Sequence, residues 1–217
     1  MAYALIPVKE LPRAKARLAP VLDDTGRREL ALALFRDVLA ATLACPALDG
    51  IAVVTRDRDL LSLAEEAGAE GLPEPGGLNE ALASASQTLT RRGIDRLVVV
   101  AADLPLANAD DIEAVALADA DVVVVRSPDG GTNALALTPG AIPFRFGPDS
   151  AQRHIDAADE AGLRSLRLEL PALTLDIDTP EDLARLRATA EEGHRLGAHT
   201  AAALKQLGLA TPPVRGG

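Results

Sequence analysis

Leu97-Val98-Val99-Val100-Ala101-Ala102-Asp103-Leu104-Pro105 is the stretch of this sequence that decides the fold. Its first five residues are all apolar, which is typical of a strand covered on both faces, as in the parallel sheets of α/β proteins. A carboxylate that directly follows such a strand is costly unless it has a partner. The stretch therefore predicts a central strand over Leu97–Ala101, with Asp103 as a polar group at its carboxyl end.

The sequence on either side of this strand alternates between apolar runs and segments of helical period. From Asp24 to Ala44, apolar residues recur at Leu30, Leu34 and Val38, the spacing that places them on one face of a helix. We expect further strands at Tyr3–Val8, Ile51–Thr55, Asp121–Arg126, Asn133–Leu137, Leu163–Leu168 and Leu173–Asp178. We expect the other helices at Leu60–Ala67, Leu78–Leu89, Asn108–Ala118, Pro148–Ala161 and from Thr179 to about Leu207. This alternation predicts an α/β fold in which helices cover both faces of a mostly parallel sheet.

Length and composition limit what such a fold can be. The 217 residues fit one domain, which we place at residues 1–209, with residues 210–217 as a flexible tail. Aromatic residues make up only 2% of the chain, so the core must be built from Leu, Val, Ile and Ala. A single cysteine, Cys45, excludes an internal disulfide and a multi-cysteine zinc site, and we expect it to be a small buried apolar residue.

The charge and the apolar pattern exclude two other classes of protein. A net charge of −10 argues against a nucleic-acid-binding protein, which needs a basic surface. It is compatible with a nucleotide pocket, where magnesium and a few nearby cations make the local charge positive. No stretch approaches the roughly 20 apolar residues that span a membrane. We therefore expect a cytoplasmic protein with neither a nucleic acid nor a membrane as partner.

Cations gather after the first expected strand. Lys9 ends the segment Pro7-Val8-Lys9, and Lys15 and Arg17 follow in a proline-containing loop before any long helix begins. A triphosphate, and the pyrophosphate that leaves it, need such groups. The alternative is a solvated basic loop, since the glycine-rich phosphate loop usual in such folds is absent from this sequence.

Carboxylates follow two of the expected strands. In parallel sheets, ligands bind beyond the carboxyl ends of the strands, which is where Asp103 lies. Alternation along Leu173–Asp178 predicts that Asp176 and Asp178 project to the same side, where like charges repel and a hard cation would neutralise them. The alternatives are a turn or cap aspartate at Asp103 and a strand end in solvent at Asp178. Together the three carboxylates predict a divalent-cation site.

The segment Phe144–Ser150 predicts the start of a helix. Gly147 would be the cap and Pro148 the first helical residue, so that the amides of residues 149–151 face outward as a phosphate site. Such a helix end orients a phosphate but is too weak to bind it tightly alone. The alternative is an ordinary capped helix.

Two further features carry less information. The loop ahead of the third expected helix contains Gly76 and Gly77, which would let a base or sugar approach the backbone closely. The histidines have no carboxylate or serine at a telling spacing, so we assign no catalytic part to His154, His194 and His199. The sequence also lacks the serine-hydrolase, Walker and zinc-protease motifs.

Several of these motifs occur together in a fixed order. They are Ile6-Pro7-Val8-Lys9 with Lys15-Ala16-Arg17-Leu18, Gly77-Leu78-Asn79, Asp103-Leu104-Pro105, Gly131-Thr132-Asn133-Ala134-Leu135, Phe146-Gly147-Pro148-Asp149-Ser150 and Asp176-Ile177-Asp178-Thr179-Pro180. This order resembles the 2-phospho-L-lactate guanylyltransferases, whose bacterial members include the phosphoenolpyruvate guanylyltransferases, enzymes that act in making the deazaflavin coenzyme F-420. The resemblance covers Ile6 to about Leu186, and the Gly-Thr-Asn and Phe-Gly-Pro-x-Ser segments are its most specific parts.

The resemblance implies a fold of the nucleotide-diphosphosugar transferase type and a set of site residues. The positions that hold the phosphorylated acid are matched by Thr132, Gly147 and Ser150. The positions at the Mg²⁺ ions, the expected cofactor, are matched by Asp103, Asp176 and Asp178. The catalytic cations of the triphosphate loop are matched by Lys9, Lys15 and Arg17. The expected nucleotide contacts are Pro7, Val8, Lys9, Gly77 and Asn79.

The implied reaction is a transfer of GMP. A phosphate oxygen of the acid attacks the α-phosphorus of GTP and pyrophosphate leaves, so chemistry rests on positioning and charge neutralisation rather than on a strong base. The acceptor stays open between phosphoenolpyruvate, 2-phospho-L-lactate and 3-phospho-D-glycerate, and the next enzyme of the pathway is a candidate transient partner. Two other functions stay open: another nucleotidyltransferase of this fold, such as a cytidylyl- or molybdopterin-guanylyltransferase, and a non-catalytic nucleotide-binding module.

Overall fold

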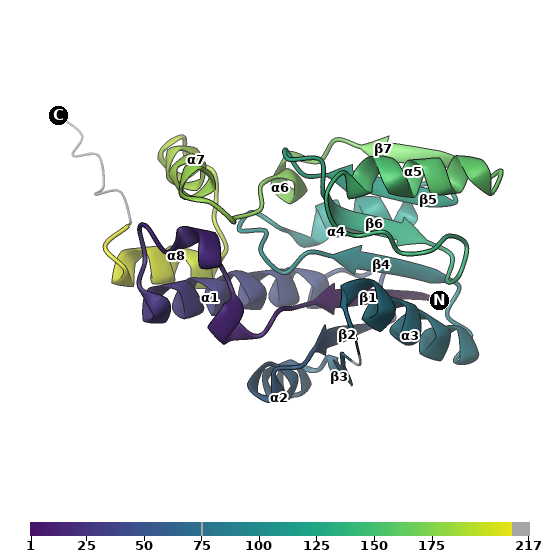
Figure 1. Ribbon diagram of the computed structural model, residues 1–217, viewed down its shortest axis with the longest axis horizontal. Coiled ribbons are helices and arrows are strands. Elements are labelled where there is room, and N and C mark those ends of the chain that lie inside the picture. The colour runs from purple at the N-terminus through teal and green to yellow at the C-terminus, as the bar shows by residue number, and fades with distance from the viewer. Residues whose placement is uncertain (75, 210–217) are drawn as a thin grey trace.

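The computed structural model describes residues 1–74 and 76–209, which form one sheet with helices packed on it (Figure 1). The expected tail, residues 210–217, lies outside the described residues. The strands are β1 (Ala2–Pro7), β2 (Gly50–Thr55), β3 (Glu70–Pro73), β4 (Arg96–Val100), β5 (Val122–Arg126), β6 (Thr132–Leu137) and β7 (Ser165–Leu168). Their order across the sheet is β3-β2-β1-β4-β6-β5-β7. β6 runs antiparallel to both of its neighbours and the other pairs are parallel, so the mostly parallel sheet is confirmed.

The helices begin and end close to the expected residues. They are α1 (Asp24–Leu43), α2 (Arg58–Ala67), α3 (Leu78–Arg91), α4 (Ala109–Leu117), α5 (Ser150–Glu160), α6 (Pro171–Thr174), α7 (Pro180–Glu191) and α8 (Ala198–Gln206), with short 3-10 turns η1 (Leu11–Arg13) and η2 (Ala16–Leu18). Asn108 caps α4 by accepting the amide of Asp111. Thr179 and Asp182 form a reciprocal capping box at the start of α7.

The core consists of two apolar layers, one on each face of the sheet. In β1, Ala4 and Ile6 face the layer under α1, α2 and α4, whereas Leu5 between them faces the layer under α3 and α5. This alternation explains why the central strands are apolar throughout. Leu, Val, Ile and Ala fill both layers, and Cys45 is buried, as expected. Helices on both faces of the sheet are thus confirmed.

A third apolar cluster lies beyond the carboxyl ends of β1 and β4, where Figure 1 shows α7 and α8. It joins η2, α1, α7 and α8 through Leu18, Leu30, Leu34, Leu186 and Leu204. This cluster fixes the loop after β1 to the helices at the C-terminal end of the chain. It therefore places the cations of that loop relative to the carboxylates near α7.

The start of α8 is capped by a residue of α1. Asp37 is buried and accepts the backbone amides of His199 at 3.0 Å and Thr200 at 2.7 Å, while Gly197 gives α8 no side-chain cap of its own. Replacing Asp37 with alanine is expected to lower the free energy of unfolding by about 1–2 kcal/mol. It should also speed hydrogen exchange in Ala198–Gln206.

The matched control is Asp37→Asn, which keeps an acceptor oxygen and should lose less than half as much stability. Exchange rates in α8 that are the same in Asp37→Ala and the unchanged chain would contradict this role.

Two parts of the sheet differ from expectation. The strand expected at Leu173–Asp178 is wrong, because α6 occupies Pro171–Thr174 and the chain then runs outside the sheet to Thr179. Proline suits the first turn of a helix, and the hydroxyl of Thr174 bonds back to the carbonyl of Leu170. β3 was missed because it is a short edge strand that contains Gly71 and lacks an apolar run.

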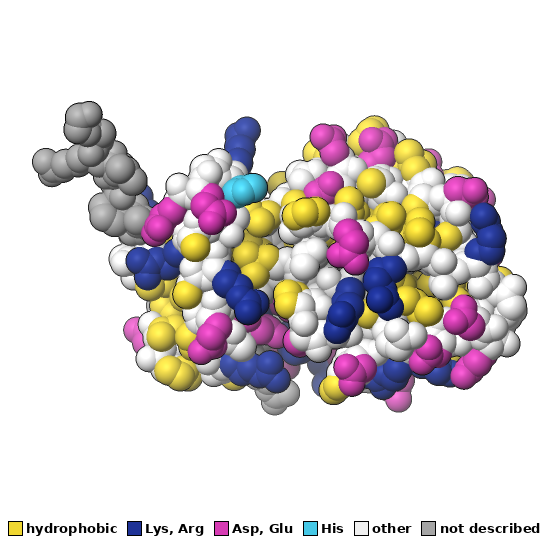
Figure 2. Space-filling model, turned by 90° about the horizontal axis from the view of Figure 1, so that it is seen from above, with side chains coloured by type: hydrophobic (Ala, Val, Ile, Leu, Met, Phe, Trp, Pro, Cys, Tyr) yellow, Lys and Arg dark blue, Asp and Glu magenta, His cyan; other side chains and the backbone are white. Residues whose placement is uncertain are grey.

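The surface agrees with the charge pattern of the sequence. Figure 2 shows acidic and basic side chains interspersed over one face, and the described residues gather no broad basic patch there. Within residues 1–74 and 76–209, no helix is long and apolar enough to cross a membrane.

Candidate active site

A cavity of about 610 Å³ opens where β1 and β4 end. Since β6 is antiparallel, its first residues, Thr132 and Asn133, reach this same edge, and the amide of Ala101 bonds to the carbonyl of Asn133. The wall is completed by the loop from Pro7 to Arg17, by Phe146, Gly147 and Ser150, and by Asp176 and Asp178. This volume is that of a small-ligand site.

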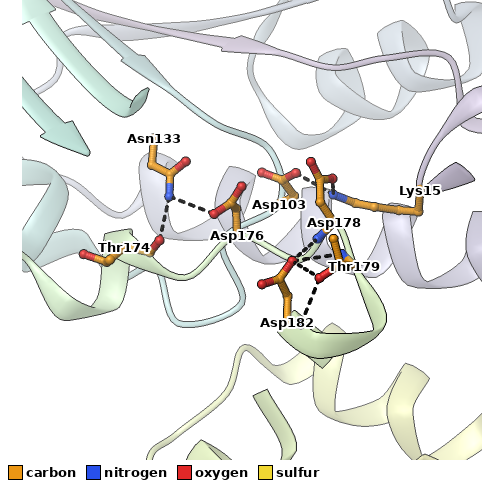
Figure 3. A network of polar contacts seen from close by, with 8 residues as sticks. All are labelled: Lys15, Asp103, Asn133, Thr174, Asp176, Asp178, Thr179 and Asp182. Atoms are coloured by element: carbon orange, nitrogen blue, oxygen red, sulfur yellow. Dashed lines mark hydrogen bonds and ion pairs between the residues drawn. The ribbon is translucent and has the colours of Figure 1, made fainter. Parts of the chain in front are cut away.

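Lys15 lies at the centre of the polar groups in this cavity. Its Nζ is 2.5 Å from an oxygen of Asp103 and 3.0 Å from an oxygen of Asp178, and its side chain is 7% exposed (Figure 3). The three residues come from the loop after β1, the end of β4 and the segment before α7. The solvated loop considered as an alternative is therefore excluded for Lys15, though Lys9 and Arg17 are exposed.

The charges of this cluster stabilise one another. Burial alone would lower the pKa of the Lys15 ammonium, but Asp103 and Asp178 outweigh it and the pKa is raised. Burial likewise opposes ionisation of Asp178, yet Lys15, with Lys9 and Arg17 further away, keeps the pKa of this carboxyl below its usual value. A lysine distant in sequence thus partly neutralises Asp178, where the sequence had suggested only a hard cation.

Asp176 differs from Asp103 and Asp178 because no cationic side chain among the described residues forms an ion pair with it. Among the described residues, its side-chain hydrogen-bond partner is the amide of Asn133, at 3.4 Å from Oδ1, and that amide also donates to the carbonyl of Thr174 at 2.8 Å. Burial, together with the negative charge of Asp103, raises the pKa of Asp176 to about 6. Among the described side chains, an ionised Asp176 therefore has no countercharge. Its orientation was predicted from the alternation of side chains along a strand, and that reason does not apply here.

The fit of the three aspartates to Mg²⁺ can be judged from these contacts. Carboxylate oxygens are the donors that this ion prefers, and the uncompensated charge of Asp176 would be relieved by it. Among the described residues, however, no three acidic, histidine or cysteine side chains are arranged to hold a metal ion. The Lys15 ammonium contacts both Asp103 and Asp178. The kind of donor therefore suits Mg²⁺, but the oxygens of Asp103 and Asp178 are occupied by Lys15, which would have to give up part of its contacts for the ion to bind.

A second polar group lies in the same cavity wall. The hydroxyls of Thr132 and Ser150 are 2.9 Å apart and buried, and Thr132 Oγ1 is 3.2 Å from Nδ1 of His154. The backbone amide of Arg145 donates to the other ring nitrogen, Nε2, at 3.0 Å. The ring of Phe146 meets the imidazole edge-on, with centroids 5.0 Å apart.

The helix that carries Ser150 begins later than expected. α5 starts at Ser150 rather than Pro148, and Asp149 is its N-cap in the left-handed region at φ 52°. The amides of Ser150 and Ala151 bond to the carbonyls of Gly147 and Gly130, so they are not free for a phosphate as expected. At Ser150 this end of α5 therefore offers the cavity a hydroxyl rather than a free backbone amide.

Backbone strain occurs at two segments of this site. Within the described chain, the non-glycine residues at positive φ are Lys15, at 54°, and Asp149, at 52°. Such conformations cost about 1–3 kcal/mol each and persist only where the surroundings enforce them. Both lie next to charged or polar groups that line the cavity, which indicates a functional origin for the strain.

Comparison with known proteins now identifies the family. Residues 2–217 match the family described as guanylyl transferase CofC like. The chain belongs to this family. The fold-type and family resemblances inferred from the motifs are thereby confirmed.

Known guanylyltransferases cover nearly the whole chain. The phosphoenolpyruvate guanylyltransferase of Rubrobacter xylanophilus is 43% identical over 193 residues, covering 86% of this chain and 94% of that protein. The 2-phospho-L-lactate guanylyltransferase of Methanothermobacter thermautotrophicus is 34% identical over 217 residues, covering 98% and 94%. A Desulfovibrio desulfuricans G20 protein assigned to the nucleotide-diphospho-sugar transferases shares the fold, with a TM-score of 0.80 at 21% identity over 97% of this chain and 99% of that one.

The predicted site residues of this guanylyltransferase-family chain fall into two groups. Those that line the cavity are Pro7, Val8, Lys9, Lys15, Arg17, Asp103, Thr132, Gly147, Ser150, Asp176 and Asp178. Gly77 and Asn79 are not among its described lining residues. Asn79 instead holds the backbone of Phe146, accepting its amide at 2.8 Å and donating to its carbonyl at 3.1 Å. Their nucleotide contacts stay predictions.

Sequence reasoning missed His154, as well as polar cavity-lining residues such as Asp129 and Asn133. His154 was assigned no part, yet it contacts Thr132, a predicted acid-site residue. A signal was present, since Ser150 lies four residues earlier and therefore on the same face of α5. The contact with Thr132 could not be foreseen, because it joins residues 22 positions apart.

His154 also predicts a pH dependence of stability. Burial, with the charges of Arg153 and Arg145, lowers its pKa to about 4, against 6.5 for the free side chain. Below pH 6.5 the imidazole of His154 therefore binds a proton in the unfolded chain but not in the folded chain. The free energy of unfolding falls as the pH drops towards 4, by up to about 3 kcal/mol. Denaturant unfolding at pH 7 and pH 5 should show that the free energy of unfolding decreases less in His154→Asn than in the unchanged chain.

The control for this prediction is His199→Asn, since the side chain of His199 is exposed. It should keep the pH slope of the unchanged chain. Equal slopes in all three proteins would contradict the burial of a neutral imidazole at position 154.

Proposed function

We propose that this chain transfers GMP from GTP to the phosphate of a small phosphorylated acid, with Mg²⁺ as cofactor and pyrophosphate as the second product. The acid is phosphoenolpyruvate or 2-phospho-L-lactate, or alternatively 3-phospho-D-glycerate. The product would serve the biosynthesis of coenzyme F-420. The names of the two relatives support the first two acids.

One observation carries this proposal. A single cavity holds a carboxylate cluster with a lysine, at Asp103, Asp176, Asp178 and Lys15, and beside it a pair of buried hydroxyls. Two anions that must react with each other need separate polar subsites on either side of a shared neutralising centre. A module that only binds a nucleotide would not require the second subsite.

The reaction forms one bond and breaks another at the same phosphorus. An oxygen of the acid's phosphate bonds to the α-phosphorus of GTP, and the bond from that phosphorus to the bridging oxygen of pyrophosphate breaks. Lys15, Lys9 and Arg17 would stabilise the negative charge that builds on the departing group. Thr132 and Ser150, with the backbone at Gly147, would orient the acid. The attacking oxygen is already ionised near neutral pH, so no base is required.

Asp103, Asp176 and Asp178 would hold Mg²⁺ between the two subsites. When bound, the ion supplies positive charge that offsets the repulsion between attacking and leaving phosphates. The contribution of this chain is to place Asp176 beside Asp103 without a cation of its own, and to keep Lys15 close enough to turn from the carboxylates to the phosphates. Pro7 and Val8, which form part of the cavity wall, would contact the nucleotide.

The test is pyrophosphate release from GTP and Mg²⁺ with each of the three acids in turn. We expect release with at least one acid, and we expect Asp103→Asn to lose about a hundredfold or more of the turnover. Replacing GTP by CTP should abolish release. A matched surface control, Asp119→Asn, should keep full activity, since Asp119 is exposed and pairs with the exposed Arg164.

Three outcomes would contradict the proposal. Release that requires CTP or a molybdopterin acceptor would assign another nucleotidyltransferase function of this fold. Nucleotide binding without release for any acceptor would indicate a non-catalytic module. A near-normal rate in Asp103→Asn would remove the metal-binding role of the aspartates.

A further inference from the structure

His154 does not line the cavity, yet it is fully buried behind the two hydroxyls that do. Its two ring nitrogens have different partners, the amide of Arg145 and the hydroxyl of Thr132. A histidine that is buried, neutral and hydrogen-bonded at both nitrogens has a fixed arrangement of donor and acceptor. That arrangement sets the direction of every hydrogen bond beyond it.

The direction follows from the amide of Arg145. A backbone N–H can only donate, so Nε2 of His154 must accept and carries no proton. The single proton of the neutral ring is then on Nδ1, and the contact with Thr132 runs from Nδ1–H to Oγ1. His154 thus donates to Thr132 and cannot accept from it.

A count of the hydroxyl protons gives the consequence. Thr132 and Ser150 have two between them, and their mutual contact at 2.9 Å uses one. Because His154 accepts neither, one proton is left to donate into the cavity. With the opposite tautomer, the imidazole would consume this proton, and the pair would present only lone pairs to the cavity, which repel an anion.

We propose that His154 is a positioning residue that makes the Thr132–Ser150 pair a hydrogen-bond donor to an anionic oxygen of the acceptor acid. The identity of that anion rests on the proposed function, whereas the direction of the hydrogen bonds does not. His154 acts through the two hydroxyls and touches neither substrate. It belongs to the acid subsite and leaves the triphosphate subsite near Lys15 unchanged.

Two variants separate this role from packing, because they remove the same ring and keep different contacts. In His154→Asn the amide nitrogen lies near the place of Nδ1 and can still donate to Thr132. In His154→Gln the terminal amide lies near the place of Nε2, where its oxygen accepts from the Arg145 amide and the donor to Thr132 is lost. A purely structural residue would not distinguish the two in substrate affinity.

The experiment measures KM for the acid and for GTP in both variants. We expect His154→Gln to raise KM for phosphoenolpyruvate, or whichever acid is turned over, by about tenfold to a hundredfold. His154→Asn should stay within about threefold of the unchanged chain, and KM for GTP should stay within about twofold in both. An unchanged acid KM in His154→Gln, or equal rises in the KM of acid and GTP, would overturn the proposal.

A second measurement does not depend on turnover. Nitrogen NMR of the histidine ring should show the proton of His154 on Nδ1, and inorganic phosphate should bind more weakly to His154→Gln than to His154→Asn. If no acid is turned over but this order of phosphate affinities holds, the proposed function fails and the positioning role stands. A proton on Nε2, or equal phosphate affinities, would overturn the positioning role.

Discussion

Replacing Lys15 with methionine is expected to lower turnover by about a hundredfold or more, while increasing the stabilisation that Mg²⁺ gives to the protein. The first effect follows because the leaving pyrophosphate loses a preorganised cation. The second follows because the ammonium, between Asp103 and Asp178, no longer competes with the metal for their oxygens. Pyrophosphate release measures the first effect, and the thermal shift on adding Mg²⁺ measures the second.

Without Mg²⁺ the same variant should be less stable than the unchanged chain. Two carboxylates lose their countercharge, and because Asp178 is 45% exposed we expect a loss of only about 1–3 kcal/mol. Lys205→Met is the matched control, since Lys205 is exposed on α8. If Lys15→Met binds Mg²⁺ no better than the control does, Lys15 does not occupy a place that the metal needs.

Replacing Asp176 with asparagine is expected to have effects of opposite sign on stability and activity. Without Mg²⁺ the variant should be more stable at pH 7, by about 1–2 kcal/mol, because the ionised carboxylate that it removes has no cation beside it. The amide of Asn133 can still donate to the new side-chain oxygen. With Mg²⁺ the variant should lose most of the metal-induced thermal shift and about a hundredfold of the turnover.

This trade between stability and function distinguishes a metal ligand from a structural aspartate. Asp119→Asn is again the control, and it should change neither the stability nor the response to Mg²⁺ by a measurable amount. A less stable Asp176→Asn variant would show that the carboxylate is satisfied in the folded protein. Retained stabilisation by Mg²⁺ would exclude Asp176 as a ligand.

Local sequence patterns predicted most of the fold. The continuous apolar run at Leu97–Ala101 and the helical period of Asp24–Ala44 are properties of neighbouring residues, and the elements formed where expected. The pattern failed at Leu173–Asp178, where alternation of apolar and polar residues indicated a strand. Pro171 favours a helical turn there, and β4 is already paired with β1 and β6, so no place in the sheet is open beside Asp103.

The sequence alone determined which residues of this protein could do chemistry: the aspartates after apolar runs, the cations after the first strand, and the hydroxyls in two glycine-containing segments. The aspartates, the cations and Ser150 follow from residue type and local period, which need no knowledge of distant contacts, whereas Thr132 follows from the resemblance to known guanylyltransferases. Only the tertiary structure decided which of them form ion pairs or hydrogen bonds with one another. Lys15 meets Asp178 across 163 positions, and His154 meets Thr132 across 22, because the antiparallel β6 and the third apolar cluster bring distant segments to one edge of the sheet. Hydrogen bonds and ion pairs act over a few ångströms in space, whatever the separation along the chain, and so the pairing of these groups is a property of the fold.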